Sequence, residues 1–87
     1  MEYVITFKNT NFAIKAEQSL LAKDLRASVM PLPSQIRAGC GICIRINEDD
    51  REQALAALAE SGIDDIELYT REGENGRFTY NYCSPTD

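Results

Sequence analysis

Apolar and polar positions alternate along three stretches of the chain, residues 2–8, 41–47 and 64–72. Alternation with a period of two is typical of a strand that buries one face. A further short strand is expected over residues 25–33, where two prolines place it at a sheet edge or terminate it. The pattern therefore predicts a four-stranded sheet as the body of the protein.

Two segments between these strands carry apolar residues at helical spacing. The first, residues 9–24, begins with "NTN", whose side chains can cap a helix. The second begins with the acidic "NEDD", where negative charge suits the helix dipole, and ends at Gly62. The apolar faces are expected to comprise Phe12, Ala13, Ala16 and Leu20 in the first helix and Ala54, Leu55 and Leu58 in the second.

The resulting order, β-α-β-β-α-β, predicts an α+β fold, a ferredoxin-like two-layer sandwich with both helices on one face of an antiparallel sheet. We assign this domain to residues 1–71. The run "REGENGRFTYNYC" follows it, with a Gly-Glu-Asn-Gly turn between two alternating segments. Residues 72–87 are therefore expected to form a C-terminal hairpin arm and tail.

The second arm of this hairpin carries Phe78, Tyr80 and Tyr82 on one side. Two interpretations stay open for it. The arm either extends the sheet and packs within its own chain, or covers the sheet face of a second copy. A two-layer domain leaves one sheet face exposed, so a homodimer is compatible with both interpretations.

Composition narrows the classes of function. The net charge is −5, and the nine basic residues are scattered singly. Phosphate contacts need clustered Lys and Arg, so no nucleic-acid partner is expected. No apolar stretch approaches the roughly 20 residues that cross a bilayer, so no membrane role is expected. The N-terminus has no basic region followed by a long apolar core, which favours a cytoplasmic location.

The chain contains no histidine, the usual general base and the commonest metal ligand. Two neighbouring cysteines and a distant Cys83 do not provide the four tetrahedral ligands of a zinc site. We therefore expect no metal and no cofactor. Any chemistry would depend on Cys, carboxylates, Lys or Tyr, which favours a carrier or binding protein over a stand-alone enzyme.

The segment "AGCGIC" is the main candidate for chemistry. Cys40 lies between Gly39 and Gly41, which allow positive φ, close approach to a ligand, and an anion-binding nest of N–H groups. Arg37 or Arg45 would lower the thiol pKa if its side chain turned inward. Cys40 is then either a working thiol on a loop or a small buried residue in a turn. The first interpretation requires a path from Cys40 to solvent.

Cys43 completes a C-x-x-C spacing with Cys40, which raises the hypothesis of a thiol-disulfide redox pair. Three residues of extended chain span roughly 10 Å, whereas a disulfide needs its Cα atoms within about 7 Å. The pair closes only if Gly41 bends the chain sharply.

Three segments, "TFKNTNFAIKAEQSLL", "MPLPSQIRAGCGICIRI" and "DDREQALAALAESGIDDIELY", together resemble the family described as putative selenium/sulfur carrier protein-like. The resemblance covers residues 3 to about 70. Its most specific element is Pro31 and Pro33 leading to the Cys40–Gly41 step. Cys43 and the hairpin beyond residue 72 lie outside it.

The resemblance implies that Cys40 holds sulfur or selenium as a persulfide or selenosulfide, received from a donor protein and passed to an acceptor protein. Arg37, Gly39 and Gly41 would shape the thiolate pocket, with Cys43 nearby. The alternative is a non-catalytic ferredoxin-like interaction or regulatory module that acts as a homodimer, in which the Gly-Cys-Gly step is only a turn.

Overall fold

The computed structural model describes residues 1–83, so the last four residues of the predicted tail lie outside the described part. A single 3₁₀ turn, Glu48–Asp50, precedes the second helix. The elements are β1 (Glu2–Thr6), α1 (Thr10–Ala22), β2 (Ala27–Pro31), β3 (Ile42–Asn47), α2 (Arg51–Glu60), β4 (Glu67–Glu74) and β5 (Arg77–Cys83).

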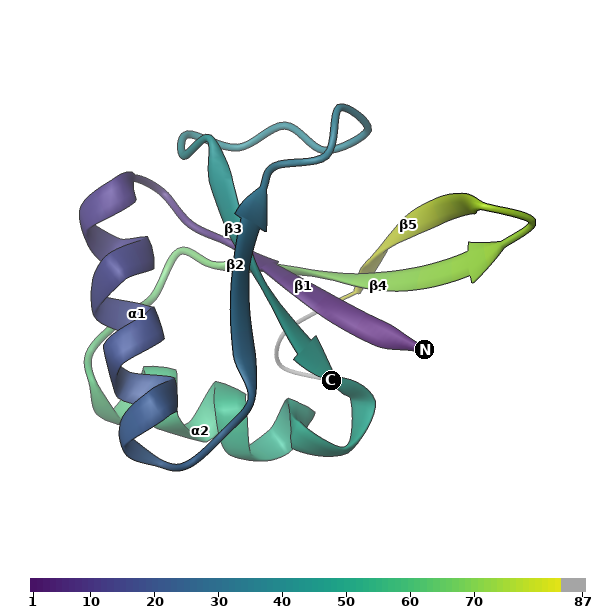
Figure 1. Ribbon diagram of the computed structural model, residues 1–87. Coiled ribbons are helices and arrows are strands. Elements are labelled where there is room, and N and C mark those ends of the chain that lie inside the picture. The colour runs from purple at the N-terminus through teal and green to yellow at the C-terminus, as the bar shows by residue number, and fades with distance from the viewer. Residues whose placement is uncertain (84–87) are drawn as a thin grey trace.

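The strands form one antiparallel sheet in the order β2-β3-β1-β4-β5, and both helices cover the same face of it (Figure 1). Each strand-helix-strand unit is split by a strand from the other unit. β3 lies between β1 and β2, and β1 lies between β3 and β4. The predicted α+β, ferredoxin-like arrangement is confirmed, and β2 is an edge strand, as its prolines indicated.

The periodicities of strand and helix explain which residues form the core between the sheet and the helices. Alternate strand residues point toward the helices, while residues three or four apart share the inner face of each helix. Small residues on these inner faces let the helices pack close to the sheet. Fully buried members of this layer are Ile5, Ile44, Leu68, Ala13, Ala16, Leu20, Ala54 and Leu58. Phe12 and Leu55, also predicted for the core, pack at its margin.

Both helices end in the same way, which fixes where the next strand begins. After α2, Gly62 has φ 73, and Ile63 N–H donates to the Leu58 carbonyl at 3.0 Å. After α1, Asp24 takes the left-handed conformation with φ 58, and Leu25 N–H donates to the Leu20 carbonyl at 3.1 Å. These are Schellman motifs, and the residue that follows each left-handed position is a buried aliphatic.

The sheet face opposite the helices is less exposed than we expected for a two-layer domain. Val4 and Cys43, which point away from the helices, are fully buried. The segment between β2 and β3 folds over them and contributes Leu32 and Ile36 to a second apolar cluster. The expectation of a bare sheet face was therefore wrong, because the long β2–β3 connection covers part of it.

β4 is longer than expected and continues to Glu74, so the same strand ends the predicted domain and forms the first arm of the hairpin. Asn75 and Gly76, with φ 53 and 79, connect it to β5. Two consecutive left-handed residues are the signature of the two-residue type I′ turn. The predicted hairpin is confirmed, and it projects beyond the layer of helices (Figure 1).

The β5 aromatics lie on the face opposite the helices, across from Gly73, Arg71 and Tyr69 of β4. Tyr80 packs against the second apolar cluster of its own chain, as the intramolecular interpretation expected. Phe78 and Tyr82 remain exposed. Among the helices of the described residues, none is long and apolar enough to cross a membrane.

Leu20 and Leu21 offer a matched test of this packing. Leu20 is fully buried between α1 and the sheet, whereas its neighbour Leu21 is 52% exposed on the same helix. We expect Leu20→Ala to lower the free energy of unfolding by about 2–5 kcal/mol, because it removes buried methyl groups and leaves a cavity. Leu21→Ala should change it by less than about 0.5 kcal/mol. Urea denaturation of both variants measures the difference, and equal losses would contradict the described core.

Candidate functional site

The segment 32–41, here called the β2–β3 loop, passes around the end of the sheet and buries a side chain on each of its faces. Ile36, 4% exposed, belongs to the cluster opposite the helices. Cys40, 1% exposed, belongs to the core between sheet and helices. The loop is closed by a hydrogen bond from Leu32 N–H to the Gly41 carbonyl at 3.0 Å. It is thus fastened to the domain by two apolar side chains on opposite sides.

Cys40 lies beneath the start of α1. Its Sγ is 3.7 Å from the Oγ1 of Thr10, the first residue of that helix. Thr10 is an exposed residue, and its contact with the thiol is partly buried. Asn9 caps the helix by accepting a hydrogen bond from Phe12 N–H at 3.0 Å. The N-terminal end of a helix carries partial positive charge, which favours an anionic sulfur species at this place.

The burial of Cys40 corrects the simplest form of the thiol hypothesis. A working thiol on an open loop was expected to have a path to solvent, and the conformation described here leaves 1% of Cys40 exposed. A donor molecule cannot reach Sγ unless the β2–β3 loop moves. This burial agrees with the alternative interpretation of Cys40 as a small buried residue in a turn, and a working thiol at this position would need the loop to open.

The two glycines act differently from the prediction. Among residues 1–83, the glycines with positive φ are Gly62 and Gly76, so neither Gly39 nor Gly41 uses the left-handed conformation that glycine allows. Gly39 is needed for space instead. A Cβ at Gly39 would lie 2.2 Å from the carbonyl oxygen of Lys8, just after β1. A Cβ at Gly41 would meet no atom within 4 Å.

The arginines do not converge on the thiol. Arg37 is exposed on the β2–β3 loop. Arg45 points to the sheet face opposite the helices, where its Nε lies 3.5 Å from a carboxylate oxygen of Glu2. Glu2 also pairs with Arg71. The condition under which Arg45 would lower the pKa of the Cys40 thiol is therefore not met, because the alternation of β3 directs Arg45 to the other face.

Cys43 is separated from Cys40 by the sheet. It is fully buried in the cluster of Val4 and Ile36, and its Sγ lies 4.0 Å from the Pro31 carbonyl, to which it donates. Burial raises the pKa of the Cys43 thiol to about 11, with Arg71 opposing and Cys40 adding to the shift. Both cysteines are free thiols. The strand geometry that argued against a C-x-x-C disulfide is present, and Cys43 is protonated at neutral pH.

A hollow of about 270 Å³ adjoins the loop at Gly39. Lys8 and Asp65 pair across its rim, with Nζ and Oδ2 3.7 Å apart. The hollow is lined by Thr6, Phe7, Lys8, Ala38, Gly39, Asp65 and Glu67. Its lining thus includes Gly39, the residue next to Cys40 in the β2–β3 loop.

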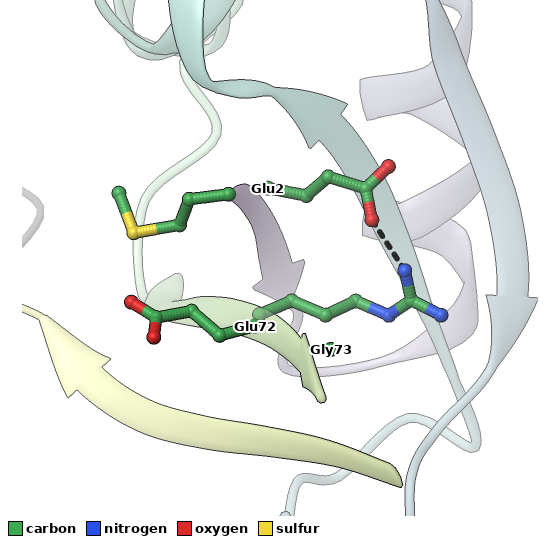
Figure 2. Close-up of a pocket in the computed structure, with 5 residues that line it drawn as sticks. Glu2, Glu72 and Gly73 are labelled. Atoms are coloured by element: carbon green, nitrogen blue, oxygen red, sulfur yellow. Dashed lines mark hydrogen bonds and ion pairs between the residues drawn. The ribbon is translucent and has the colours of Figure 1, made fainter. Parts of the chain in front are cut away.

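A larger hollow, about 410 Å³, lies at the other end of β1, between Met1, Glu2, Arg71, Glu72 and Gly73. Figure 2 shows Glu2 reaching across to the guanidinium with which it pairs, while the Glu72 carboxylate points away. The Glu2 carboxylate offsets the charge of this guanidinium. Within the described residues, no group of three or more His, Cys, Asp or Glu side chains could hold a metal ion.

Sequence reasoning singled out Cys40 as a candidate but did not foresee its contact with Thr10 or the approach of Gly39 to the Lys8 carbonyl. Asn9 or Thr10 was expected at a helix start, yet nothing in the local pattern indicated that this start lies over Cys40. The contact joins residues 30 positions apart. It depends on how the β2–β3 loop crosses the sheet, which the local periodicity does not encode.

Gly39→Ala tests the fastening of the loop. The added methyl group clashes with the Lys8 carbonyl, so we expect a loss of about 1–3 kcal/mol in the free energy of unfolding. Displacement of the loop should also make Cys40 react at least about tenfold faster with a thiol reagent such as Ellman's reagent, a rise that corresponds to about 1.4 kcal/mol in loop opening. Gly41→Ala is the control and should leave both quantities nearly unchanged. Equal reactivity of Cys40 in the two variants would contradict this arrangement.

The raised pKa of Cys43 predicts a dependence of stability on pH. Between about pH 9 and pH 11 the thiol ionises in the unfolded chain but stays protonated in the folded one. As pH rises, the unfolded state therefore loses the Cys43 proton before the folded state does. This ionisation lowers the free energy of unfolding by up to ~1.4 kcal/mol per pH unit. Denaturation across this range should show a shallower decline for Cys43→Ala than for the wild type. Cys83→Ala serves as control, and identical slopes for Cys43→Ala and wild type would contradict the shift.

A comparison with known protein families gives one match. The family model described as "Putative Se/S carrier protein-like" covers residues 2–70, which include β1 through the first half of β4 and the whole β2–β3 loop. No curated protein and no solved structure matches the chain. The match spans most of the chain and contains Cys40 with its surroundings, and the chain belongs to the Se/S carrier protein-like family.

Proposed function

We propose that this protein carries a sulfur or selenium atom on Cys40 and delivers it to an acceptor protein in the cytoplasm. The family match supports a carrier role that depends on partner proteins. The observation that favours Cys40 is its position, with Sγ 3.7 Å from Thr10 Oγ1 at the N-terminal end of α1. Cys43, the other cysteine within residues 2–70, is a strand residue whose pKa is raised to about 11.

The chemistry is transfer of one chalcogen atom between thiols. The Cys40 thiolate attacks the terminal sulfur of a donor persulfide, a new S–S bond forms at Cys40, and the donor S–S bond breaks with release of the donor thiolate. An acceptor nucleophile then attacks the terminal sulfur, and the Cys40 thiolate leaves. The sulfur keeps its oxidation state throughout, so neither step needs an external oxidant or reductant. Terminal selenium follows the same course.

The surroundings of Cys40 suit such a cargo. Positive charge at the start of α1 favours the anionic persulfide, and Thr10 Oγ1 can donate a hydrogen bond to it. Arg37, exposed on the same loop, offers positive charge to an approaching anionic donor. None of these roles requires histidine, which the chain lacks.

Burial gives the carrier a closed state. With 1% of Cys40 exposed, a loaded sulfur would be shielded from water and from small thiols that would strip it. Loading and delivery then require the β2–β3 loop to open, and a partner that binds the open form would speed both steps. Gly39 and Gly41 lie on either side of Cys40, and the hollow beside Gly39 is the surface through which we expect the partner to act.

Intact-protein mass spectrometry tests the carrier residue. After incubation of the reduced protein with glutathione persulfide, we expect a gain of one sulfur atom in the wild type and none in Cys40→Ser. Cys83→Ser is the matched control, since Cys83 is the partly exposed thiol on which an adventitious adduct would form. An adduct that persists in Cys40→Ser and disappears in Cys83→Ser would overturn the assignment. Because the loop shields Cys40, the adduct should form faster in Gly39→Ala.

A further inference from the structure

The two edges of the sheet differ in how they are protected. β2 is five residues long and ends at Pro31, which cannot donate a main-chain hydrogen bond. β5 is seven residues long, contains no proline, and has Arg77 as its only charged residue. Within residues 1–83, no strand pairs with the outer side of β5. An unpaired strand without charges or proline is a template for pairing with another strand.

The aromatic residues of β5 are held in place but incompletely covered. The Phe78 ring lies over Gly73, where a Cβ would come within 2.8 Å of it. The Arg71 guanidinium stacks on this ring at 3.6 Å from its centroid. Tyr82 meets Tyr69 edge to face, with centroids 5.7 Å apart. Phe78 and Tyr82 nevertheless stay 43% and 61% exposed.

We propose that β5 is a homodimer interface, at which two copies pair their β5 strands antiparallel about a two-fold axis. Pairing over the full length of the strand fixes the register. Tyr80 then lies opposite the partner's Tyr80, and Phe78 lies opposite the partner's Tyr82. On the other face, Thr79 lies opposite the partner's Asn81.

This register makes the strand complementary to itself. The exposed Phe78 and Tyr82 of each copy meet as cross-strand aromatic pairs, which stabilise antiparallel sheets. Thr79 and Asn81 form polar pairs on the opposite face. Arg77 lies opposite the partner's Cys83, so no like charges face one another. The composition of β5 therefore favours a second copy over an unrelated strand, whose charges and aromatics would match only by chance.

The contact is small. It consists of one pair of seven-residue strands and six aromatic side chains, three from each copy, that are already partly covered. Interfaces of this size lie below those of stable dimers, so we expect a reversible dimer with a dissociation constant on the order of micromolar. The β2–β3 loop connects the two strands at the opposite edge of the sheet from β5. The proposal is thus independent of the carrier chemistry of Cys40.

Two double variants test the register directly. Thr79→Lys with Asn81→Lys places lysines opposite one another at two positions across the axis, and we expect the dissociation constant to rise by at least about tenfold. Thr79→Lys with Asn81→Glu places lysine opposite glutamate at the same two positions, and dimerisation should stay within about threefold of wild type. Thr79 and Asn81 are both exposed in the single chain, so neither variant disturbs its core.

Sedimentation velocity over a range of concentrations, with reductant present to prevent disulfides through Cys83, measures the association. Circular dichroism verifies that each variant is folded. The two added lysines lower the net charge of −5 in magnitude, so weaker association of that variant cannot arise from general repulsion. A monomeric wild type at every concentration would overturn the proposal, as would equal dimerisation or equal loss in the two double variants.

An engineered disulfide gives a second readout. Directly opposed residues of antiparallel strands have Cα atoms about 4.5–5.5 Å apart, which lies within disulfide range. Arg77→Cys places a thiol opposite the partner's Cys83, so oxidation should yield a covalent dimer joined between positions 77 and 83. Peptide mapping that finds only 83–83 links would contradict the register.

Discussion

The central position of β1 is the constraint on which the rest of the structure depends. This strand pairs with β3 on one side and β4 on the other, and from Val4 to Phe7 every residue is buried. A strand of an antiparallel sheet usually leaves one face in water, but here both faces of β1 need a cover. The helices cover one face and the β2–β3 loop covers part of the other. The loop that holds Cys40 is thus part of the packing as well as a connection between strands.

The sequence predicted the elements and their order because each has a local cause. Alternation indicated the strands, helical spacing indicated α1 and α2, and prolines indicated the edge position of β2. What it missed depends on contacts between distant residues. The cover over Val4 by Ile36, the approach of Gly39 to the Lys8 carbonyl and the position of Cys40 beside Thr10 each require the loop to cross the end of the sheet. The two glycines around Cys40 indicated an unusual backbone. They did not indicate that Gly39 is needed to avoid a clash with the Lys8 carbonyl, whereas a side chain at Gly41 would meet no neighbouring atom.

The burial of Cys40 changes how a carrier of this kind would behave. If transfer requires the loop to open first, the rate of loading rises with donor concentration only until opening becomes limiting. A donor that binds the loop in its open form could load the protein much faster than a small thiol compound of equal reactivity. Discrimination among donors would then arise from recognition of the loop and the adjoining hollow, with little contribution from the intrinsic reactivity of the thiol.

The length of β4 has a consequence for how the domain relates to its family. β4 pairs with β1 through residues 67–71 and with β5 through residues 68–74, whereas the family match ends at residue 70. If the chain of such a domain ended where β4 stops pairing with β1, at residue 71, β4 itself would form the outer edge of the sheet. Adding β5 moves that edge outward by one strand and replaces its side chains with a largely uncharged, aromatic set. The hairpin therefore determines which strand forms this edge of the sheet without changing any residue of the β2–β3 loop.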